Sequence, residues 1–320
     1  MKLLKITTVI LAALIAVSFC ACSGGNSTAA ETTAAEQNET VKPNDTEAGA
    51  QTQPETGSLT AADIDTTPVK GSDKLAFSEY DDGYMITGPG ECTDAELIIP
   101  SHIDGKPVTR IDESAFRDNL NLKSVIIPWT VKVIDEDAFA GCENLESVTF
   151  SEGLESFDES AFYGCKAIKS LTLPSTLLSV DSYTFYGCSS LEEVTMLGCY
   201  DIRTNSFAEC TSLRSVVIKS DKVPEYGYSI KSNAFSGCKA VEKIIFAPGL
   251  SEIGSWNFAD TANLKEVFLP DTIKKIDACV FLRSGLEKIN YGGTEDEWKN
   301  VEIKEPQFNY EIVYNSEYVK

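Results

Sequence analysis

Two consecutive segments decide the fold. Residues 122–144 read LKSVIIPWTVKVIDEDAFAGCEN, and residues 145–167 read LESVTFSEGLESFDESAFYGCKA. Each has 23 residues, and their apolar, Asp, Phe and Cys positions coincide when the two are aligned. A repeat of this length is typical of proteins built from stacked units, in which each unit contacts only its neighbours.

A phenylalanine marks this interval in eight successive repeats, at steps of 22, 23 or 28 residues. Apolar residues stand five positions before each one, and further aliphatic columns follow it. Columns that keep register for this long predict inward-facing positions of one continuous core. The phenylalanine column consists of Phe116, Phe139, Phe162, Phe185, Phe207, Phe235, Phe258 and Phe281.

Each repeat predicts one coil of a right-handed solenoid with about eight 23-residue coils. The segment around Val125, Ile126 and Ile127 alternates inward and outward like a short strand, so we expect the coils to form one parallel sheet. Asp135 precedes DAFAGC and is a good N-cap, which predicts a short helical turn on the opposite side. The expected fold class is therefore an α/β solenoid of leucine-rich repeats.

The ends of such an array need caps, because a terminal coil would otherwise expose its core. We expect one domain over residues 74–320, with an N-terminal cap at 74–100, repeats at 101–289 and a C-terminal cap at 290–320. In the last of these, FNYEIVYNSEYV alternates like an extra strand or hairpin.

The repeat unit L-x-x-V-x-I-P-x-x-V-x-x-I-x-x-x-A-F-x-x-C resembles the BspA-like leucine-rich repeat family of bacterial surface proteins. The opening GYMITGPGECTDAELIIPSHIDGKPVTRIDESAF and the closing INYGGTEDEWKNVEI resemble the ends of that array. The likeness extends from about Tyr84 to Ile303. It implies a surface location, and several members of the family are adhesins that bind host or bacterial proteins.

The N-terminus predicts export. Lys2 and Lys5 precede an apolar run too short to span a membrane, and SFCACSGG follows it, so we expect a signal peptide over residues 1–21. The small residue before Cys22 resembles a lipobox, which implies lipidation of Cys22; plain secretion with cleavage nearby is the alternative. Residues 22–73 lack aromatic residues and any hydrophobic period, so they predict a disordered spacer.

The formal net charge of −22 excludes nucleic acid as a partner, since phosphate backbones would repel the protein. Anionic lipid surfaces repel it too, so we expect membrane contact only through the lipid anchor. Cationic partners and neutral glycans remain open.

Five of the ten cysteines follow the repeat period. This spacing differs from the short clusters of zinc sites, and in-register side chains are too far apart for disulfides, so we expect buried free thiols. Cys199 takes a buried aliphatic position, and Cys92 and Cys279 stand apart near opposite ends. The ladder comprises Cys142, Cys165, Cys188, Cys210 and Cys238.

An acidic ladder occupies another repeat position, at Asp112, Asp135, Asp158 and Asp181. These residues are either helix N-caps or an edge that binds calcium, because a hard cation would relieve the repulsion of stacked carboxylates. The sequence singles out no metal site.

The outward strand residues form a second candidate surface. Val217, Ile245 and Phe268 come from adjacent coils and predict an exposed apolar patch for a partner. Strand propensity alone is the alternative reason for such residues.

The repeat that ends at Phe235 is five residues longer than the others, and its extra segment contains Tyr226 and Tyr228. Insertions of this kind often lie on a binding face, although a tolerated insertion is equally compatible. Trp129 follows a strand proline and is another exposed aromatic candidate.

Nothing predicts catalysis or a cofactor. His102 is the single histidine and falls in a turn of the N-terminal cap, and the S-x-x-K match at 236–239 lies inside the repeat. We therefore expect a non-enzymatic, lipid-anchored surface module that binds a protein, such as a host matrix or cell-surface protein. The alternative is an envelope-associated structural protein that binds glycan or peptide.

Overall fold

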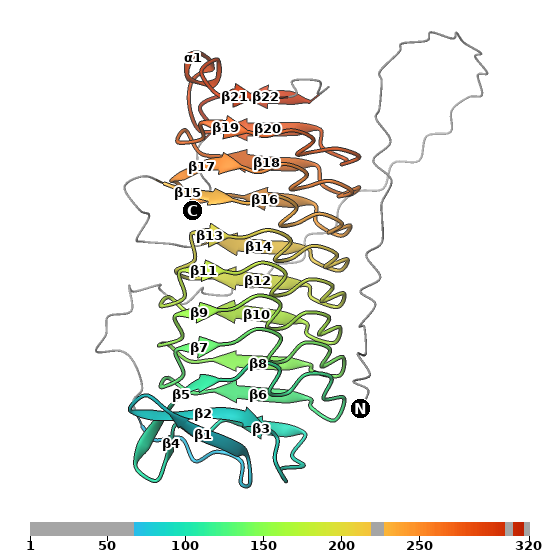
Figure 1. The fold of residues 1–320 in the computed structure, drawn as a ribbon. Coiled ribbons are helices and arrows are strands. Elements are labelled where there is room, and N and C mark those ends of the chain that lie inside the picture. Colours follow the sequence, from blue (N-terminus) through green and yellow to red (C-terminus); the bar gives the residue numbers. More distant parts are fainter. Residues whose placement is uncertain (1–66, 219–226, 305–309, 317–320) are drawn as a thin grey trace, which may run out of the picture. The chain divides into compact units, whose positions relative to one another are not determined.

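The computed structural model describes residues 67–218, 227–304 and 310–316. The expected signal peptide, Cys22, most of the expected spacer and Tyr226 lie outside the described residues. Within them the chain winds into a stack of coils with strands on two sides and turns on the third (Figure 1). This architecture is a parallel β-solenoid.

The first side of each coil, here called the long-strand face, carries a strand of three or four residues. These strands pair in parallel and in register, so that Thr172 pairs with Thr195 and Thr195 with Val217. Hydrogen bonds join them as β3-β6-β8 and as β10-β12-β14-β16-β18-β20-β22. The strands are β3 (Glu96–Ile98), β6 (Ser124–Ile127), β8 (Ser147–Phe150), β10 (Ser170–Leu173), β12 (Glu193–Met196), β14 (Ser215–Ile218), β16 (Lys243–Ile245), β18 (Glu266–Leu269), β20 (Lys288–Tyr291) and β22 (Glu311–Val313).

The second side, the short-strand face, corrects the expectation of a single sheet. Most of its strands have only two residues, as in β7, which ends on the buried Ile134. A strand this short shows no alternation, so its sequence gives no strand signal. The strands are β5 (Lys106–Ile111), β7 (Val133–Ile134), β9 (Ser156–Phe157), β11 (Ser179–Val180), β13 (Asp201–Ile202), β15 (Tyr228–Ile230), β17 (Leu250–Ile253), β19 (Lys275–Ile276) and β21 (Glu302–Ile303).

The third side, the turn face, does not confirm the expected helical turns or the α/β class. Between residues 135 and 142 the chain makes turns in which Asp137 and Gly141 have φ angles of +57° and +72°. Left-handed residues cannot continue an α-helix. Backbone groups bond the next coil instead, and the N–H of Phe139 donates to the carbonyl of Ala161 at 2.8 Å.

A stack of phenylalanine rings fills the core, which confirms the inward direction predicted for this column. Neighbouring rings lie between 5.0 and 5.8 Å apart, with planes within 3–16° of parallel. Even the end members, Phe116 and Phe281, are only 2% and 4% exposed. Every coil therefore buries one ring between the rings of its neighbours, which gives one continuous core.

The N-terminal cap is an antiparallel hairpin of β1 (Ala76–Tyr80) and β2 (Gly83–Gly88), with β4 (His102–Ile103) paired to β5. The described chain already packs on it before residue 74. The N–H of Ser72 donates to the carbonyl of Ile98 at 2.7 Å, and the N–H of Ser101 donates to the carbonyl of Val69 at 3.1 Å. These bonds cover the outer edge of β3.

The C-terminal cap contains α1 (Glu295–Trp298), the single α-helix among the described residues. Thr294 and Glu297 form a capping box at its start. Trp298 packs edge-on against Tyr291 with ring centroids 5.0 Å apart. β22 pairs in parallel with β20, as expected of an extra strand in this segment.

Candidate functional site

The candidate site is a stripe of outward side chains that runs along the long-strand face. Each strand contributes one of them, and the register places it beside its counterparts in the coils before and after. A rigid sheet holds these side chains at strand spacing, about 4.8 Å apart. In order, the stripe is Ile98, Ile126, Thr149, Thr172, Thr195, Val217, Ile245, Phe268, Asn290 and Val313.

The structure brings the predicted apolar residues together. Val217 pairs with Ile245, and Ile245 pairs with Phe268, so the three form an unbroken run on the sheet. All three are half-buried. The ammonium group of Lys243 lies 4.3 Å from the centre of the Phe268 ring, a cation–π contact that orients the ring. The run ends at Asn290, which pairs with Phe268.

A second apolar pair occupies the N-terminal end of the stripe. Ile98 pairs with Ile126, whose side chain is 39% exposed. The three threonines between this pair and Val217 are smaller and carry a hydroxyl. The stripe therefore has two apolar ends and a polar middle.

Charges beside the stripe alternate in sign from coil to coil. Lys265 lies 2.7 Å from Glu287, and Lys123 lies 3.8 Å from Glu146. Exposed pairs of this kind add little stability, but alternation leaves this edge of the stripe with no strong field of either sign. The alternating residues are Lys123, Glu146, Lys169, Glu192, Arg214, Glu242, Lys265 and Glu287.

Tyr228 is not part of an exposed loop, contrary to the prediction. It lies in β15 with 5% of its surface exposed, and its hydroxyl donates to the carbonyl of Ala247 at 3.0 Å. Burial raises the pKa of this phenol well above its usual range. The apolar ring and a partner for the hydroxyl make it a core residue, whereas its sequence neighbours Gly227 and Tyr226 suggested a loop.

Trp129 is half-buried rather than fully exposed. Its ring centre lies 6.1 Å from that of His102, and its indole nitrogen is buried without a hydrogen-bond partner. It stands four coils from Val217, or about 19 Å at strand spacing. Trp129 and the apolar run therefore belong to different parts of the surface.

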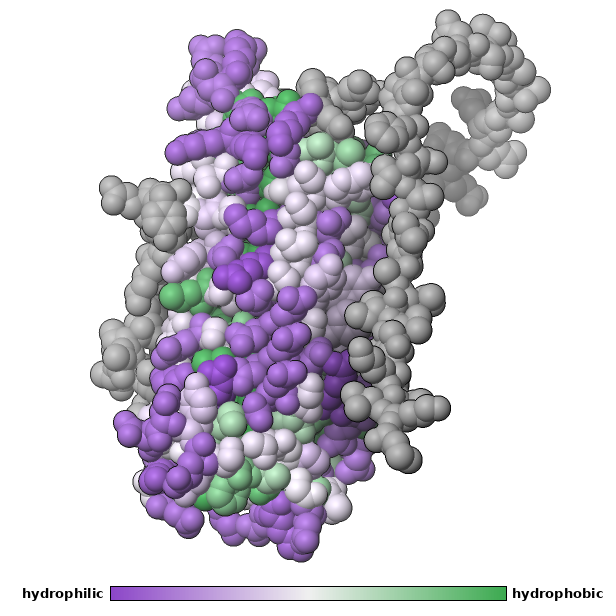
Figure 2. Space-filling model, viewed as in Figure 1, coloured by the Kyte–Doolittle hydropathy of each residue, from purple (hydrophilic) through white to green (hydrophobic). Residues whose placement is uncertain are grey.

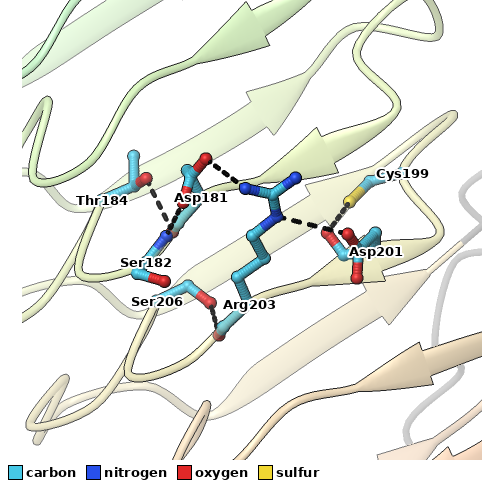
Figure 3. A network of polar contacts seen from close by, with 7 residues as sticks. All are labelled: Asp181, Ser182, Thr184, Cys199, Asp201, Arg203 and Ser206. Atoms are coloured by element: carbon cyan, nitrogen blue, oxygen red, sulfur yellow. Dashed lines mark hydrogen bonds and ion pairs between the residues drawn. The ribbon is translucent and has the colours of Figure 1, made fainter.

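The acidic ladder caps turns instead of helices, and arginines neutralise it. The carboxylate of Asp112 accepts the N–H of Glu113 at 2.9 Å. Arg203 lies between Asp181, at 2.7 Å, and Asp201, at 3.3 Å (Figure 3). At the other end of the ladder, a guanidinium takes the place that a cation would fill.

That guanidinium belongs to Arg110, which binds both oxygens of the buried Asp135 and lies 3.9 Å from Asp158. The hydrogen bond to Asp135 raises the pKa of Arg110, so its charge is permanent. Burial raises the pKa of Asp158, and the neighbouring Asp135 raises it further. The described residues contain no group of ligands able to hold a metal ion.

The cysteine ladder is buried, and its thiols are free. Each Sγ donates to the carbonyl of the phenylalanine one coil earlier, at 3.1 Å for Cys142 and 3.2 Å for Cys165. Desolvation raises the pKa of Cys142, Cys188 and Cys199 to about 12. Such thiols are protonated at neutral pH, which makes them packing groups and poor nucleophiles.

Ser101 and Ser236 donate to or accept from backbone groups, and His102 lies beside Ser101. Nδ1 of His102 lies 3.1 Å from the hydroxyl of Ser101, but that serine is fully buried and bonds the backbone of Val69. The hydroxyl of Ser236 donates to the carbonyl of Ala259 at 3.5 Å. In the S-x-x-K match at 236–239, the repeat places Cys238 in the core.

The sequence reasoning missed three tyrosines of the turn face: Tyr163, Tyr183 and Tyr186. The signal for Tyr163 and Tyr186 is the tetrapeptide FYGC, which occurs at 162–165 and again at 185–188, and Tyr183 lies two residues before the second copy. Hydrophilic residues predominate on the face seen in Figure 2, where apolar residues form separate patches.

The repeats match the family model of the BspA type leucine-rich repeat region, in six copies over residues 109–228 and 218–309. The chain belongs to this family. No curated protein matches it. Among the residues described, no helix has the length and hydrophobicity needed to cross a membrane.

Several solved bacterial structures resemble this BspA-type chain. A leucine-rich cell surface protein from Faecalibacterium prausnitzii is 18% identical, with a TM-score of 0.35, and the match covers 74% of this chain and 98% of that one. A leucine-rich repeat protein from Bacteroides ovatus is 18% identical, with a TM-score of 0.37 and coverage of 76% and 89%. One from Bacteroides capillosus is 28% identical, with a TM-score of 0.34 and coverage of 41% and 99%.

Proposed function

We propose that this BspA-type protein is a non-enzymatic surface module that binds a protein partner through its long-strand face. The partner class is a host matrix protein or a surface protein of another cell. The observation that carries the proposal is the run of Val217, Ile245 and Phe268, which the register sets side by side. Apolar side chains in contact on an exposed sheet often mark a partner site.

The rigidity of the solenoid supports this role. The stacked phenylalanine rings and the coil-to-coil hydrogen bonds hold the stripe in place before any partner arrives. A preformed surface loses less conformational entropy on binding than a flexible one. The charges beside the stripe alternate in sign, so they favour neither a cationic nor an anionic partner. Recognition would therefore depend on shape and apolar contact.

A triple variant tests the face. Val217→Ser, Ile245→Ser and Phe268→Ser, made together in the full chain, are expected to weaken binding to the protein's partner at least tenfold. Binding is measured by surface plasmon resonance against purified extracellular-matrix proteins and surface proteins of other bacteria. The matched control changes Thr149, Thr172 and Thr195 of the same stripe to Ser and should bind like the wild type. If the triple variant bound the partner as tightly as the threonine control, the long-strand face would not be the binding surface.

The location is a separate part of the proposal: Cys22 carries a lipid that anchors the chain on the outer side of a bacterial membrane, and residues 22–73 act as its spacer. The export pattern of residues 1–21 supports it. Cys22→Ser is expected to move the protein from the membrane fraction into the medium and to abolish incorporation of a labelled fatty acid. Persistent membrane association of that variant would contradict the anchor.

The alternative function, envelope-associated binding of glycan or peptide, is favoured by one observation. Tyrosines from two adjacent coils form a group on the turn face, and none of them belongs to the hydrophobic core.

A further inference from the structure

The tyrosine cluster of the turn face consists of Tyr163, Tyr183 and Tyr186. The rings of Tyr163 and Tyr186 are stacked, with centroids 5.1 Å apart and planes 4° from parallel. Tyr183 leans on Tyr186 at 5.8 Å and 48°. Tyr163 is 42% exposed, and the other two are half-exposed. Three aromatic rings with their hydroxyls thus share one small area of surface.

The surroundings of the tyrosine cluster leave room for a ligand. The position after the core phenylalanine holds Ala140 in the preceding coil and Ala208 in the following coil, and alanine is too short to cover a tyrosine ring. Gly164 and Gly187 directly follow the stacked tyrosines, and apart from their own chain neighbours no atom lies within 4 Å of where a Cβ would stand on either. At the equivalent Gly237, the carboxylate of Glu209 from the preceding coil occupies that space.

The backbone at Tyr183 shows that the fold alone does not favour an aromatic residue there. Tyr183 has a φ of +59°, which is unfavourable for a bulky side chain. Asn205 and Asn233 take the same position in the next two coils, with φ values of +58° and +59°. Asparagine tolerates this conformation far better. Trp256 takes the same position with a φ of +61°, so the repeat itself imposes this conformation, and asparagine is the substitution that relieves the strain at Tyr183.

The electrostatics exclude anionic ligands. The formal charge of the chain is −22, and Glu209 lies close enough to Tyr186 to raise the pKa of that phenol further, after the larger effect of desolvation. A ligand for this surface must therefore be neutral or cationic.

The stacking reduces the aromatic area that could hold a cation. Cations bind the negative face of an aromatic ring, and Tyr163 and Tyr186 present one such face each to the other, which leaves one outer face on each ring. What they turn outward includes ring edges, which carry partial positive charge, and hydroxyl groups that donate and accept hydrogen bonds. The free outer faces suit an apolar, flat surface such as the C–H face of a sugar ring.

We propose that Tyr163, Tyr183 and Tyr186 form a binding site for a neutral glycan. A pyranose ring packs its C–H face on a free tyrosine face, over the open space at Gly164 or Gly187, while its hydroxyls bond the phenols. The site deepens the alternative function given above and is independent of the long-strand face.

Affinity electrophoresis of the full chain in native gels tests the site. The gels contain uncharged polysaccharides, namely mannan, dextran, galactan and hydroxyethyl cellulose in turn, with heparin and poly-L-lysine as charged comparisons. We expect at least one neutral polysaccharide to retard the protein and heparin to leave it unaffected. Tyr163→Ala and Tyr186→Ala should each weaken the interaction about tenfold.

Tyr183→Asn separates binding from folding. It relieves the backbone strain, so the variant should melt at the same temperature as the wild type or higher while it binds the polysaccharide more weakly. The matched control is Trp256→Asn, because Trp256 is 40% exposed and takes the same repeat position with a φ of +61°. That control should bind normally, as should the triple serine variant of the long-strand face.

Three results would each overturn the glycan site: no retardation by any of the four neutral polysaccharides, retardation unchanged by all three tyrosine variants, or an interaction confined to poly-L-lysine. The last would assign the surface to cationic peptides. If the long-strand variant kept its protein binding while retardation in these gels stayed normal, the long-strand proposal would fail and the glycan site would still stand.

Discussion

The thiol of Cys165 donates a hydrogen bond to the backbone carbonyl of Phe139, one coil earlier, with Sγ and O 3.2 Å apart. The same bond recurs through the cysteine ladder, so these residues are both core packing groups and links between coils. In the next coil of the column, Thr261 keeps a donor at this position, but its hydroxyl donates within its own coil, to the carbonyl of Phe258 at 2.6 Å. The position selects a small side chain that can donate a hydrogen bond.

Stability should fall at alkaline pH because of these thiols. The folded pKa of Cys188 is about 12, against an ordinary value of 9.0. Above pH 9 the unfolded chain loses this proton while the folded chain keeps it, so the contribution is complete below pH 9 and declines as the pH rises toward 12. Each such thiol costs about 1.4 kcal/mol per pH unit in that window.

Urea unfolding at pH 7, 9 and 10 measures this decline. Cys188→Ser removes one of the titrating groups, so its free energy of unfolding should fall less steeply above pH 9 than that of the wild type. Identical slopes would show that Cys188 does not keep its proton in the folded protein.

The phenylalanine stack should be weakest at its ends. Phe162→Ala removes a ring that contacts Phe139 and Phe185 on its two sides, and it should lower the free energy of unfolding by about 3–5 kcal/mol. Phe281 closes the stack and is 4% exposed, so Phe281→Ala should cost less. Chemical denaturation of both variants gives the comparison. If Phe281→Ala lowered the free energy of unfolding more than Phe162→Ala did, the core would not be most tightly packed in the middle of the array.

Two glycines should differ in their tolerance of alanine. Gly187 has a φ of +70° and open space around the Cβ position, so Gly187→Ala adds only backbone strain, about 1 kcal/mol. Gly153 has a φ of +120°, and a Cβ there would stand 2.3 Å from the carbonyl oxygen of Trp129. Gly153→Ala should therefore lower the melting temperature by several degrees more. Equal melting temperatures would mean that the backbone at Gly153 can relax.

Arg110, which pairs with a buried carboxylate, should contribute more to the free energy of unfolding than Lys166, which pairs with an exposed one. Asp135 is 6% exposed, so Arg110→Met leaves a buried charge without its partner and should cost about 3 kcal/mol. Lys166 and Glu143 form a pair at 2.7 Å whose side chains are both more than half exposed, so Lys166→Met should cost below about 1 kcal/mol. Urea titration compares the two.

The same variant bears on calcium. In the wild type, arginines occupy the ladder, so we expect the melting temperature to be equal in EDTA and in millimolar calcium. If calcium raised the melting temperature of Arg110→Met but not that of the wild type, the guanidinium would be confirmed as the substitute for a cation. If calcium raised the melting temperature of the wild type, the acidic ladder would bind calcium after all.

Much of the fold could be predicted from residues alone. The phenylalanine column, the inward Val125 and the buried cysteines all follow from apolar periodicity, because the inside of a solenoid repeats with the sequence. The sequence predicts a helical turn at Asp135 because an Asp before DAF satisfies helix capping, and nothing local shows that Asp137 is left-handed. Coil-to-coil hydrogen bonds stabilise that conformation, and they exist only once coils stack.

By itself, the sequence determined the interval, the inward positions and the family, since each depends on which residues recur and not on where neighbours lie. The tertiary structure decided the second sheet, the turn face, the burial of Tyr228, the placement of arginines between aspartates and the grouping of three tyrosines. Those features depend on contacts between neighbouring coils, whose geometry is set by the pitch and register of the stack.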